Sequence, residues 1–334
     1  MKKIGIILNN IGSPNSPEPK DVKKFLAEFL MDEDVINIPW LFRLILVRGI
    51  IVPIRGVSSS EKYKKIWFHE GSPLMVHSRR LAQKLQANLG SNYMVELGMR
   101  YGEPSIASAL AKFKQAGIDK IIFAPLYPQY AEATTSASIK ELKRVIKSTA
   151  DEFKVHELQP FYHEAFFQNY WIEQYQARSS QKWDHVLFSF HGLPESQIKK
   201  TSGCLETANC CEHKDSCAKN CYRAQCFATA NMIANKVGLE AKDYTVSFQS
   251  RLGRAKWIQP YTEATLENLA KNSKKNVLIL SPAFVADCVE TLEEIQLELR
   301  EKFLAWGGVD LHQVACPNDD SHWAEGFAKH LQSL

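Results

Sequence analysis

Short apolar runs alternate with amphipathic stretches along most of the chain. Residues 3–9 (KIGIILN) and 185–190 (HVLFSF) are apolar at almost every position, which is typical of strands buried on both faces of a parallel sheet. Residues 19–30 follow a helical period after a Gly-Ser-Pro turn. Strands and helices that alternate in this way predict right-handed crossovers and a doubly wound α/β sheet.

The same order of elements occurs twice, which indicates an internal duplication. The matched segments are 3–9 with 185–190, 94–100 with 245–250 and 120–124 with 276–280 as strands, and 105–114 with 261–270 and 139–147 with 292–303 as helices. We therefore expect two similar doubly wound parallel-sheet domains, 1–165 and 166–334, with a cleft between them. The last helical segment, 320–334, could close either domain.

Polar residues gather where the expected strands end. Ligands of open α/β sheets bind at the carboxyl ends of the strands, so these positions are candidates for a site. They are Asn9, Asn10, Arg100, Tyr101, residues 127–130 (YPQY), His191, residues 249–251 (QSR), Asp287 and Glu290.

Composition excludes several classes of protein. The 334 residues are 45% hydrophobic and 23% charged, as in an ordinary globular protein. The net charge of +4 is modest and the basic residues are spread along the chain, which argues against a nucleic-acid partner. The opening run MKKIGIILNN has no small-residue cleavage site, so we interpret it as a strand rather than a signal peptide.

Residues 40–54 (WLFRLILVRGIIVPI) form the most apolar later stretch. It is shorter than the roughly 20 residues of a membrane-spanning helix and is interrupted by Arg43, Arg48 and Pro53. Two interpretations remain: a buried helix, or a lip that touches a membrane interface or an amphipathic ligand.

Six of the eight cysteines fall within residues 204–226. Because no export signal is recognised, we expect a reducing, cytoplasmic compartment, where clustered cysteines bind metal more often than they form disulfides. The spacing C-x5-C-C-x5-C-x3-C belongs to Cys204, Cys210, Cys211, Cys217 and Cys221. Only its last pair resembles the knuckle of a zinc site, whereas four thiolates are what an iron–sulfur cluster needs.

The segments FSFHGLPE (188–195) and PAFVADCVETLEE (282–294) carry the clearest chemical signal. Asp287 and Glu290 are three residues apart, which predicts that both carboxylates share one face where a helix begins, although Asp287 could simply cap that helix. The imidazole of His191 can exchange protons near neutral pH or bind a metal ion, and so can a carboxylate. Taken alone, a histidine at a strand end is as often structural as catalytic.

With GMRYGEPS (98–105), LYPQY (126–130) and FQSRLGRAKWIQPYT (248–262), these segments resemble ferrochelatases of Gram-negative bacteria over nearly the whole chain. The resemblance implies two Rossmann-like, chelatase-type domains and a porphyrin cleft. It also implies insertion of Fe²⁺ into protoporphyrin IX with release of two protons, giving protohaem. His191 and Glu290 would be the catalytic and metal-handling residues.

The resemblance further implies a set of porphyrin contacts. They are Ile11, Tyr63, Ser72, Arg100, Tyr101, Tyr127 and Trp257. Core packing is the alternative for the three aromatic residues Tyr63, Tyr127 and Trp257, but in a cleft they would grip a large flat ligand. Arg100 would pair with a propionate, as would, on weaker grounds, Arg43, Arg48 or Arg55.

The resemblance also bears on the cysteines. Cys288 stands where many ferrochelatases have a histidine, so a second imidazole is absent, and metal insertion requires no nucleophilic thiol. The segment 204–221 resembles the insertion of bacterial ferrochelatases that carry a 2Fe-2S cluster. A structural zinc ion, or no metal, is the alternative, and Cys226 is expected to pack in the core.

Two rival functions remain. One is a chelatase for another metal or tetrapyrrole, such as cobalt insertion into a corrin precursor, and the other is a haem-binding carrier. The LYPQY and FQSRLG segments favour ferrochelatase, and intact His191 and Glu290 argue against a carrier. The sequence leaves the oligomeric state and the choice between protoporphyrin and coproporphyrin open, and residues 40–54 suggest peripheral contact with the inner face of the membrane.

Overall fold

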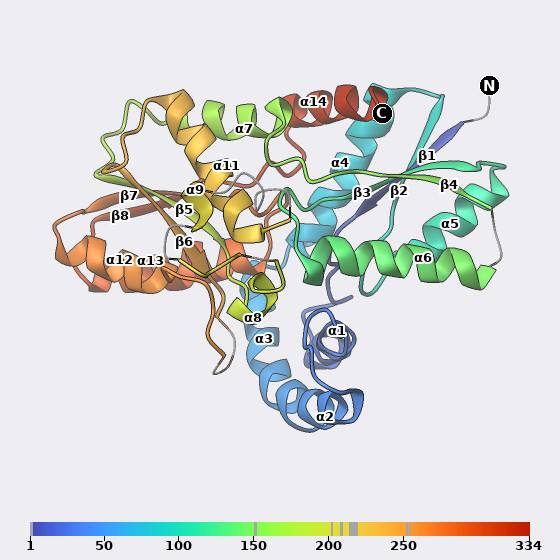
Figure 1. Cartoon of the computed structure of the whole chain (residues 1–334), viewed down its shortest axis with the longest axis horizontal. Helices are drawn as coiled ribbons and strands as arrows, with labels where there is room; N and C mark the ends of the chain where they lie inside the picture. Colours follow the sequence, from blue (N-terminus) through green and yellow to red (C-terminus); the bar gives the residue numbers. More distant parts are fainter. Residues whose placement is uncertain are drawn as a thin grey trace. The chain divides into compact units, whose positions relative to one another are not determined.

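The chain forms two compact units. The computed structural model describes residues 3–149, 152–201, 203–207, 210–213, 220–251, 253 and 255–334. The first unit comprises residues 1–127, 132–159 and 318–334, and the second comprises 128–131 and 160–317 (Figure 1).

The first unit is built on a sheet of four parallel strands in the order β2-β1-β3-β4. Its elements are β1 (Ile4–Asn9), α1 (Pro19–Leu30), α2 (Trp40–Leu44), the π-helix η1 (Ile45–Ile51), α3 (Val52–Ile66), α4 (Pro73–Leu89), β2 (Tyr93–Leu97), α5 (Ile106–Gln115), β3 (Lys120–Pro125), the π-helix η2 (Glu132–Ser136), α6 (Ala137–Thr149), β4 (Lys154–Glu157) and α14 (Ser321–Gln332). Alternate residues of β1 and β3 face α5 and α6, where Ile7, Phe123, Phe113 and Leu142 belong to one core cluster.

The second unit repeats this plan, with four parallel strands in the order β6-β5-β7-β8. Its elements are α7 (Ala165–Gln176), β5 (His185–His191), α8 (Glu195–Ile198), α9 (Cys210–His213), α11 (Tyr222–Val237), β6 (Tyr244–Gln249), α12 (Thr262–Lys271), β7 (Asn276–Leu280), the π-helix η3 (Val289–Leu299), α13 (Arg300–Ala305) and β8 (Asp310–Gln313). Leu187, Ile279, Leu266 and Phe303 share its core cluster. The predicted α/β class and the predicted duplication are both confirmed.

The domain boundaries differ from the expected division at residue 165. The main segment of the second unit begins at residue 160, residues 128–131 also belong to that unit, and residues 318–334 belong to the first unit. Helix α14 packs on α4. Just before it, Asp319 pairs with His77 (Nδ1 to Oδ1, 2.9 Å) and with Lys84 of α4, which fastens the end of the chain to the first unit.

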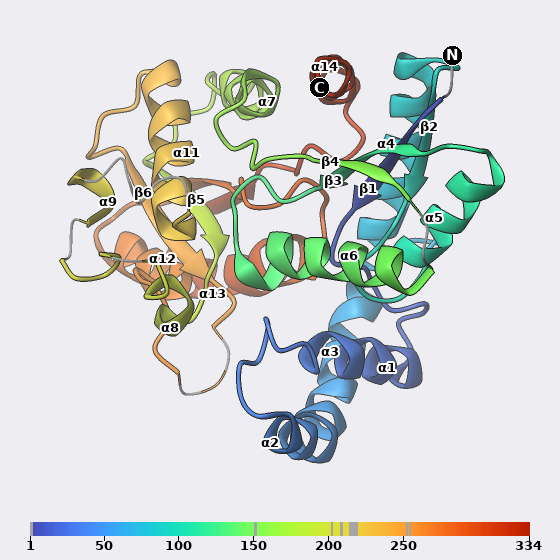
Figure 2. The same cartoon turned by 45° about the vertical axis from the view of Figure 1, so that its right-hand side comes forward.

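Helices α1, α2 and α3 project from the sheet of the first unit (Figures 1 and 2). The buried-helix interpretation of residues 40–54 is wrong for most of this segment, because large apolar side chains face outward. They are Trp40, Leu41, Phe42, Ile45, Ile50 and Ile54. Val47 and Val52 are buried against Leu30 of α1, and Ile51 packs against the same cluster. Among the described residues, every helix is too short or too polar to cross a bilayer.

Arg43 is the exception among the basic residues of this projection. Its side chain is buried, and Nη1 donates to the carbonyl oxygens of Ile36 (3.1 Å) and Ile38 (3.2 Å). The guanidinium therefore fastens the loop after α1 to α2 and is not presented to a substrate propionate, contrary to the weaker expectation for this residue.

Candidate active site

His191 is the last residue of β5 in the second unit. Its ring Nδ1 lies 2.6 Å from the carbonyl oxygen of Gly192. A carbonyl oxygen only accepts, so Nδ1 carries the proton and Nε2 keeps its lone pair. His191 can thus accept a proton or ligate a metal ion through Nε2.

The chain around His191 is tightly fitted. A Cβ on Gly192 would lie 2.7 Å from the carbonyl oxygen of Gln249, so glycine allows β5 and β6 to stay paired at the point where they end. The rings of Trp257 and Phe284 have centroids 6.3 and 6.4 Å from that of His191. The Tyr222 hydroxyl donates to the His191 carbonyl oxygen at 2.9 Å. An imidazole held between aromatic rings suits a flat, apolar ligand.

Glu290 lies in the first turn of the π-helix η3, in the same unit as His191. Gln249 links the two residues: it is the strand neighbour of His191, and its Nε2 donates to the Glu290 carbonyl oxygen at 2.8 Å. Its Oε1 accepts from the Ser189 hydroxyl at 2.7 Å. One buried side chain therefore fixes the start of η3 against the end of β5.

The three-residue spacing predicted that Asp287 and Glu290 share a helix face, and this prediction is wrong. Helix η3 begins only at Val289, after Asp287, and it is a π-helix to which the α-helical period does not apply. The Asp287 carboxylate is buried and accepts from the Thr291 hydroxyl (2.9 Å) and the Cys316 backbone N–H (3.3 Å). These contacts give Asp287 a structural role.

Cys288 is buried directly before η3 and is hydrogen-bonded to the Glu290 side chain. Burial, with the nearby Glu290 carboxylate, raises the pKa of this thiol well above its usual range. A neutral thiol is a poor nucleophile, which agrees with the expectation that Cys288 attacks nothing.

In the first unit, three predicted porphyrin contacts lie side by side. The backbone N–H of Tyr101 donates to the Ile11 carbonyl oxygen (3.0 Å), and the backbone N–H of Arg100 donates to the Asn10 carbonyl oxygen (2.8 Å). Gly12 has φ +99°, and a Cβ there would lie 1.9 Å from the Tyr101 carbonyl oxygen. Glycine at this position is what lets the loop after β1 meet the loop after β2.

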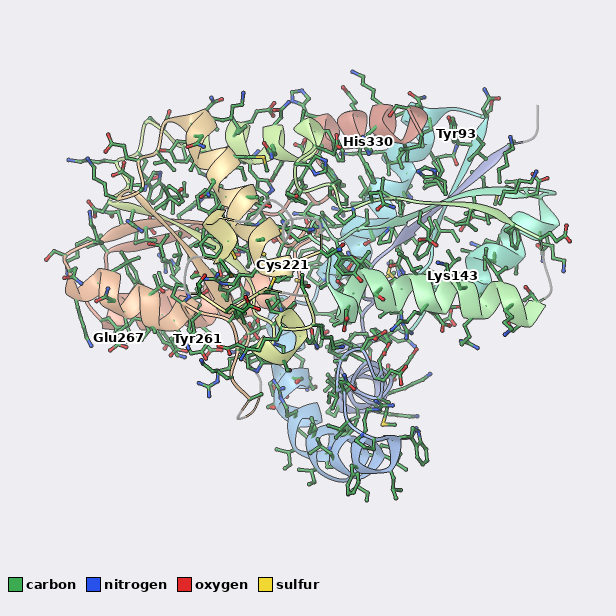
Figure 3. All side chains as sticks on the ribbon, viewed as in Figure 1. Tyr93, Lys143, Cys221, Tyr261, Glu267 and His330 are labelled. Carbon is green, nitrogen blue, oxygen red and sulfur yellow. The ribbon has the colours of Figure 1, made fainter. Side chains whose placement is uncertain are left out.

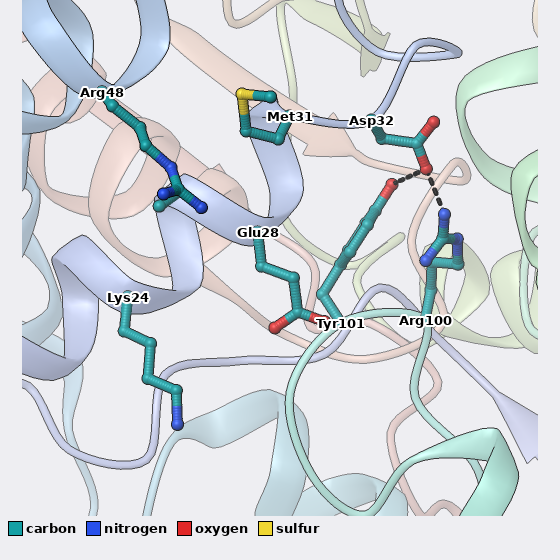
Figure 4. A pocket seen from close by; sticks show the side chains of 8 residues that line it. Lys24, Glu28, Met31, Asp32, Arg48, Arg100 and Tyr101 are labelled. Carbon is teal, nitrogen blue, oxygen red and sulfur yellow. Dashed lines mark hydrogen bonds and ion pairs between the residues drawn. The ribbon is translucent and has the colours of Figure 1, made fainter. Parts of the chain in front are cut away.

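Arg100 and Tyr101 share one partner, which the sequence did not reveal. The Asp32 carboxylate accepts from the Tyr101 hydroxyl at 2.8 Å and from Nη2 of Arg100 (Figure 4). Burial raises the pKa of the Tyr101 hydroxyl, and it does the same for Tyr127. Both hydroxyls therefore stay neutral at physiological pH.

Two of the three other predicted contacts of the first unit, Ser72 and Tyr63, have local partners of their own. Ser72 is the N-cap of α4, with its hydroxyl accepting from the Met75 backbone N–H at 3.4 Å. Tyr63 of α3 packs edge-on against Trp67 at 5.9 Å between ring centroids. Porphyrin contact stays a prediction for both residues.

Four of the five candidate cluster ligands lie in the described part of the second unit. Cys204, Cys210 and Cys221 are buried, and Cys217 lies outside the described residues. The sulfur atoms of Cys210 and Cys211 are 3.9 Å apart. Cys221, at the start of α11 (Figure 3), is hydrogen-bonded to the thiols of Cys211 and Cys204.

Further contacts favour the thiolate of Cys221, whereas the hydrogen bond to Cys221 and burial raise the pKa of Cys211 despite the nearby Arg223. Nη1 of Arg223 donates to the sulfur of Cys211 at 3.0 Å. The hydrogen bond from Cys211 is the main cause that lowers the pKa of Cys221 to about 6, helped by backbone N–H groups of α11. Across the described residues, which omit Cys217, no three His, Cys, Asp or Glu side chains are arranged to hold one metal ion.

The four described thiols form one series of contacts, in the order Cys210, Cys211, Cys221 and Cys204. A structural zinc ion needs four donors around a single centre, whereas a 2Fe-2S cluster binds two thiolates on each of two irons. Thiolates are ligands of both kinds of site, and the described segment supplies four of the five candidate thiols.

Sequence reasoning missed the roles of Asp32 and Gln249. Asp32 opens the acidic run DED at 32–34, which without tertiary contacts is indistinguishable from a solvated loop. Gln249 was among the polar strand ends, but only the strand register places it beside His191. The sequence indicated Gln249 only as a polar residue at the end of an expected strand.

Comparisons with known proteins agree with this geometry. The family model described as Ferrochelatase matches residues 3–333. A ferrochelatase of Bdellovibrio bacteriovorus is 49% identical over 335 residues, covering 100% of both chains. One of Pseudomonas fluorescens (strain Pf0-1) is 46% identical, covering 97% of this chain and 96% of its own.

The fold is also similar to that of solved chelatases. The structure of SirB from Bacillus subtilis with Fe³⁺ aligns with a TM-score of 0.56 at 12% identity, covering 99% of this chain and 95% of that one. Sequence identity this low establishes the shared fold alone. On the match over nearly its whole length and on its identity to these relatives, the chain belongs to the ferrochelatase family, whose members insert iron into porphyrin in haem biosynthesis.

Proposed function

We propose that this ferrochelatase inserts Fe²⁺ into protoporphyrin IX and that His191 and Glu290 carry the reaction. Porphyrin takes up iron only after two pyrrole N–H protons leave, while Fe²⁺ sheds most of its water. The reaction therefore needs a proton acceptor and a metal ligand close together. An imidazole and a carboxylate can divide these two tasks in either order.

The observation that carries this proposal is the free Nε2 of His191. The Nδ1 hydrogen bond to Gly192 leaves Nε2 as the ring's acceptor, beside Trp257 and Phe284. Gln249 holds η3, and with it Glu290, against the strand that carries His191. Both residues belong to one unit, so their proximity does not depend on how the two units are arranged.

The deciding assay is anaerobic mixing of the purified protein with Fe²⁺ and protoporphyrin while the haem spectrum is followed. Coproporphyrin serves in a parallel reaction, and we expect the higher kcat/KM with protoporphyrin. A higher value with coproporphyrin would overturn the substrate assignment. Porphyrin or haem binding without any insertion would leave the carrier as the function.

Porphyrin contact is proposed for Ile11, Tyr63, Ser72, Arg100, Tyr101 and Tyr127 in the first unit and for Trp257 in the second. The proposal of porphyrin contact is best supported for Ile11, Arg100 and Tyr101, because backbone hydrogen bonds hold their two loops together. Bending the ring plane would expose the nitrogen lone pairs, and about 1–5 kcal/mol of such strain can come from contacts elsewhere on the substrate. Aromatic and arginine side chains around the ring edge supply contacts of that kind.

Peripheral membrane contact is proposed for the exposed face of α2, η1 and α3, which would place the enzyme at the inner face of the membrane. Aromatic and aliphatic side chains lie outward there, and Arg48 is exposed among them. Such a face suits the boundary between lipid headgroups and acyl chains, where a hydrophobic porphyrin also partitions.

Replacing Trp40, Phe42 and Ile54 together by serine should lower binding to anionic vesicles at least about tenfold, because each side chain loses apolar area that would leave water. Vesicle co-sedimentation measures this. The buried Val47 and Val52 stay intact, so the melting temperature should not change. Val309→Ser, at an exposed apolar residue of the second unit, is the control; equal binding of the triple variant and this control would contradict membrane contact.

A resident 2Fe-2S cluster is proposed for the cysteines of residues 204–221, and the contacts of Cys221 with the thiols of Cys211 and Cys204 support it. Arg223 would donate a charge-assisted hydrogen bond to a ligand sulfur, and the start of α11 would stabilise the Cys221 thiolate. When bound, the cluster supplies iron–sulfur bonds that tie these segments together.

Protein purified without oxygen should be coloured and hold about two irons and two sulfides per chain. Cys204→Ser, Cys211→Ser, Cys217→Ser and Cys221→Ser should each remove the colour and lower the melting temperature, since cluster binding contributes to folding. The adjacent Cys210→Ser is the matched control and should keep the cluster, because Arg223 contacts Cys211. Stoichiometric zinc without sulfide would replace this proposal by a structural zinc site.

A further inference from the structure

Asp32 follows α1 and reaches both Arg100 and Tyr101 from a distant part of the chain. Its carboxylate contacts Nη2 of Arg100 and accepts from the Tyr101 hydroxyl at 2.8 Å. The Asp32 side chain is 6% exposed and that of Arg100 is 18% exposed. An ion pair so well shielded from water is much less screened than a surface pair.

The three side chains form one rigid group. The Arg100 guanidinium carbon lies 4.5 Å from the centroid of the Tyr101 ring, so the cation stacks on the ring while both bind the same carboxylate. Asp32 compensates the charge of Arg100. Asp32 contacts only Nη2 of the Arg100 guanidinium, which has five N–H donors, so further donors of this group remain for a ligand.

The loop that carries Asp32 is itself fixed. The other carboxylate oxygen of Asp32, Oδ1, accepts from the Asp34 backbone N–H at 2.9 Å, and the Asp32 carbonyl oxygen accepts from the Ile36 N–H at 3.0 Å. Arg43 of α2 then binds the Ile36 carbonyl oxygen. A chain of contacts thus runs from the base of the exposed projection to Arg100.

A pocket of about 530 Å³ opens beside this group, between α1, η1 and the loop after β2 (Figure 4). Glu28 in its wall accepts weakly from the Gly102 backbone N–H at 3.2 Å, which ties α1 to the residue after Tyr101. Two residues on the α1 side of the pocket therefore hold this loop: Asp32 contacts Arg100 and Tyr101, and Glu28 contacts Gly102.

We propose that Asp32 is a positioning residue for porphyrin binding: it holds the Arg100 guanidinium and the Tyr101 ring in the orientation in which they meet the substrate. This inference rests on the proposed porphyrin contacts of Arg100 and Tyr101. Without the carboxylate, Arg100 carries an uncompensated, partly buried charge and turns toward water, and Tyr101 loses its hydroxyl partner.

Asp32→Asn keeps the side-chain shape and removes the charge. We expect the KM for protoporphyrin to rise about tenfold and kcat to change less than about threefold, because the substitution leaves His191 and Glu290 untouched. Steady-state kinetics and quenching of porphyrin fluorescence measure the two effects. Asp32→Glu should restore part of the affinity.

Asp34→Asn is the matched control. It makes the same chemical change two residues away and breaks the pair with Lys140 (2.6 Å), which involves neither Arg100 nor Tyr101. We expect a wild-type KM and a melting temperature close to that of Asp32→Asn. If Asp32→Asn does not fold, Tyr101→Phe removes one contact of the same carboxylate from the other side and should raise KM in the same direction.

A double-mutant cycle separates this inference from its premise. In an Arg100→Met background, Asp32→Asn should add little further loss, since Asp32 acts through Arg100. If Arg100→Met raises KM but Asp32→Asn does not, or if the two losses simply add, Asp32 has no positioning role. If Arg100→Met leaves KM unchanged, the proposed porphyrin contact of Arg100 fails, and the inference fails with it.

Discussion

Replacing His191 by alanine should abolish iron insertion, with a loss in kcat of about 10³-fold, while porphyrin still binds within about threefold of wild type. Proton transfer by a positioned side chain typically contributes 10²–10⁴-fold, and alanine removes both the acceptor Nε2 and any bond to the metal. Binding should survive because Trp257 and Phe284 keep their places around the site. Anaerobic insertion kinetics and porphyrin fluorescence titration measure the two quantities.

His156→Ala is a suitable control for this variant. His156 is an exposed residue of the edge strand β4 in the first unit, and it makes no contact with His191. Added imidazole should return part of the rate to His191→Ala, by occupying the space of the lost ring, and should do nothing for His156→Ala. An alanine variant at 191 that kept most of the wild-type rate would remove His191 from the mechanism.

Glu290→Gln should lower kcat at least about 10²-fold with little change in the free energy of unfolding. Glutamine keeps the size of the side chain but can neither take up a proton nor bind Fe²⁺ as an anion. The fold contact of this residue is made by its backbone carbonyl, which accepts from Gln249 and is unaltered by the substitution. Insertion kinetics and thermal melting of the same preparation test both parts.

Glu301→Gln, on the exposed surface of α13, makes the same change outside the proposed site and should keep full activity. A Glu290→Gln variant that melts far below wild type would make Glu290 a structural residue. Full activity in a well-folded variant would end its catalytic assignment. Loss of activity with normal folding is the pattern expected of a residue that handles protons or metal.

The hydrogen bonds around His191 and Glu290 explain what the two variants are expected to change. His191 has one fixed ring nitrogen and one free one, whereas Glu290 has a fixed backbone and a side chain shared with the Cys288 thiol. The backbone of Glu290 and the Nδ1 atom of His191 therefore make the contacts that fix these residues, and the Glu290 carboxylate contacts only the Cys288 thiol among the interactions described above. Substitution of the structural partners, such as Gln249, should instead lower activity and stability together.

The sequence by itself determined the architecture of each half. Residues 3–9 and 185–190 are apolar on both faces and are followed by glycine turns and amphipathic segments, a local pattern that permits little except a buried parallel strand and a crossover helix. The helix at 19–30 begins and ends where the pattern placed it. His191 and Glu290 were also predicted from the sequence, because each lies in a recognisable motif near the end of an expected strand, and their catalytic roles stay a prediction.

Only the tertiary structure decided the features that depend on contacts between distant residues. Asp32 and Arg100 are 68 positions apart, and Gln249 and Glu290 are 41 apart, so no local spacing connects them. The apolar period of residues 40–54 is the same whether the helix is buried or exposed, and only the packing of α1 and α3 shows that its outer face is uncovered. That η3 is a π-helix and begins only at Val289, after Asp287, is likewise seen only in the structure, because backbone propensity alone favours the ordinary helix.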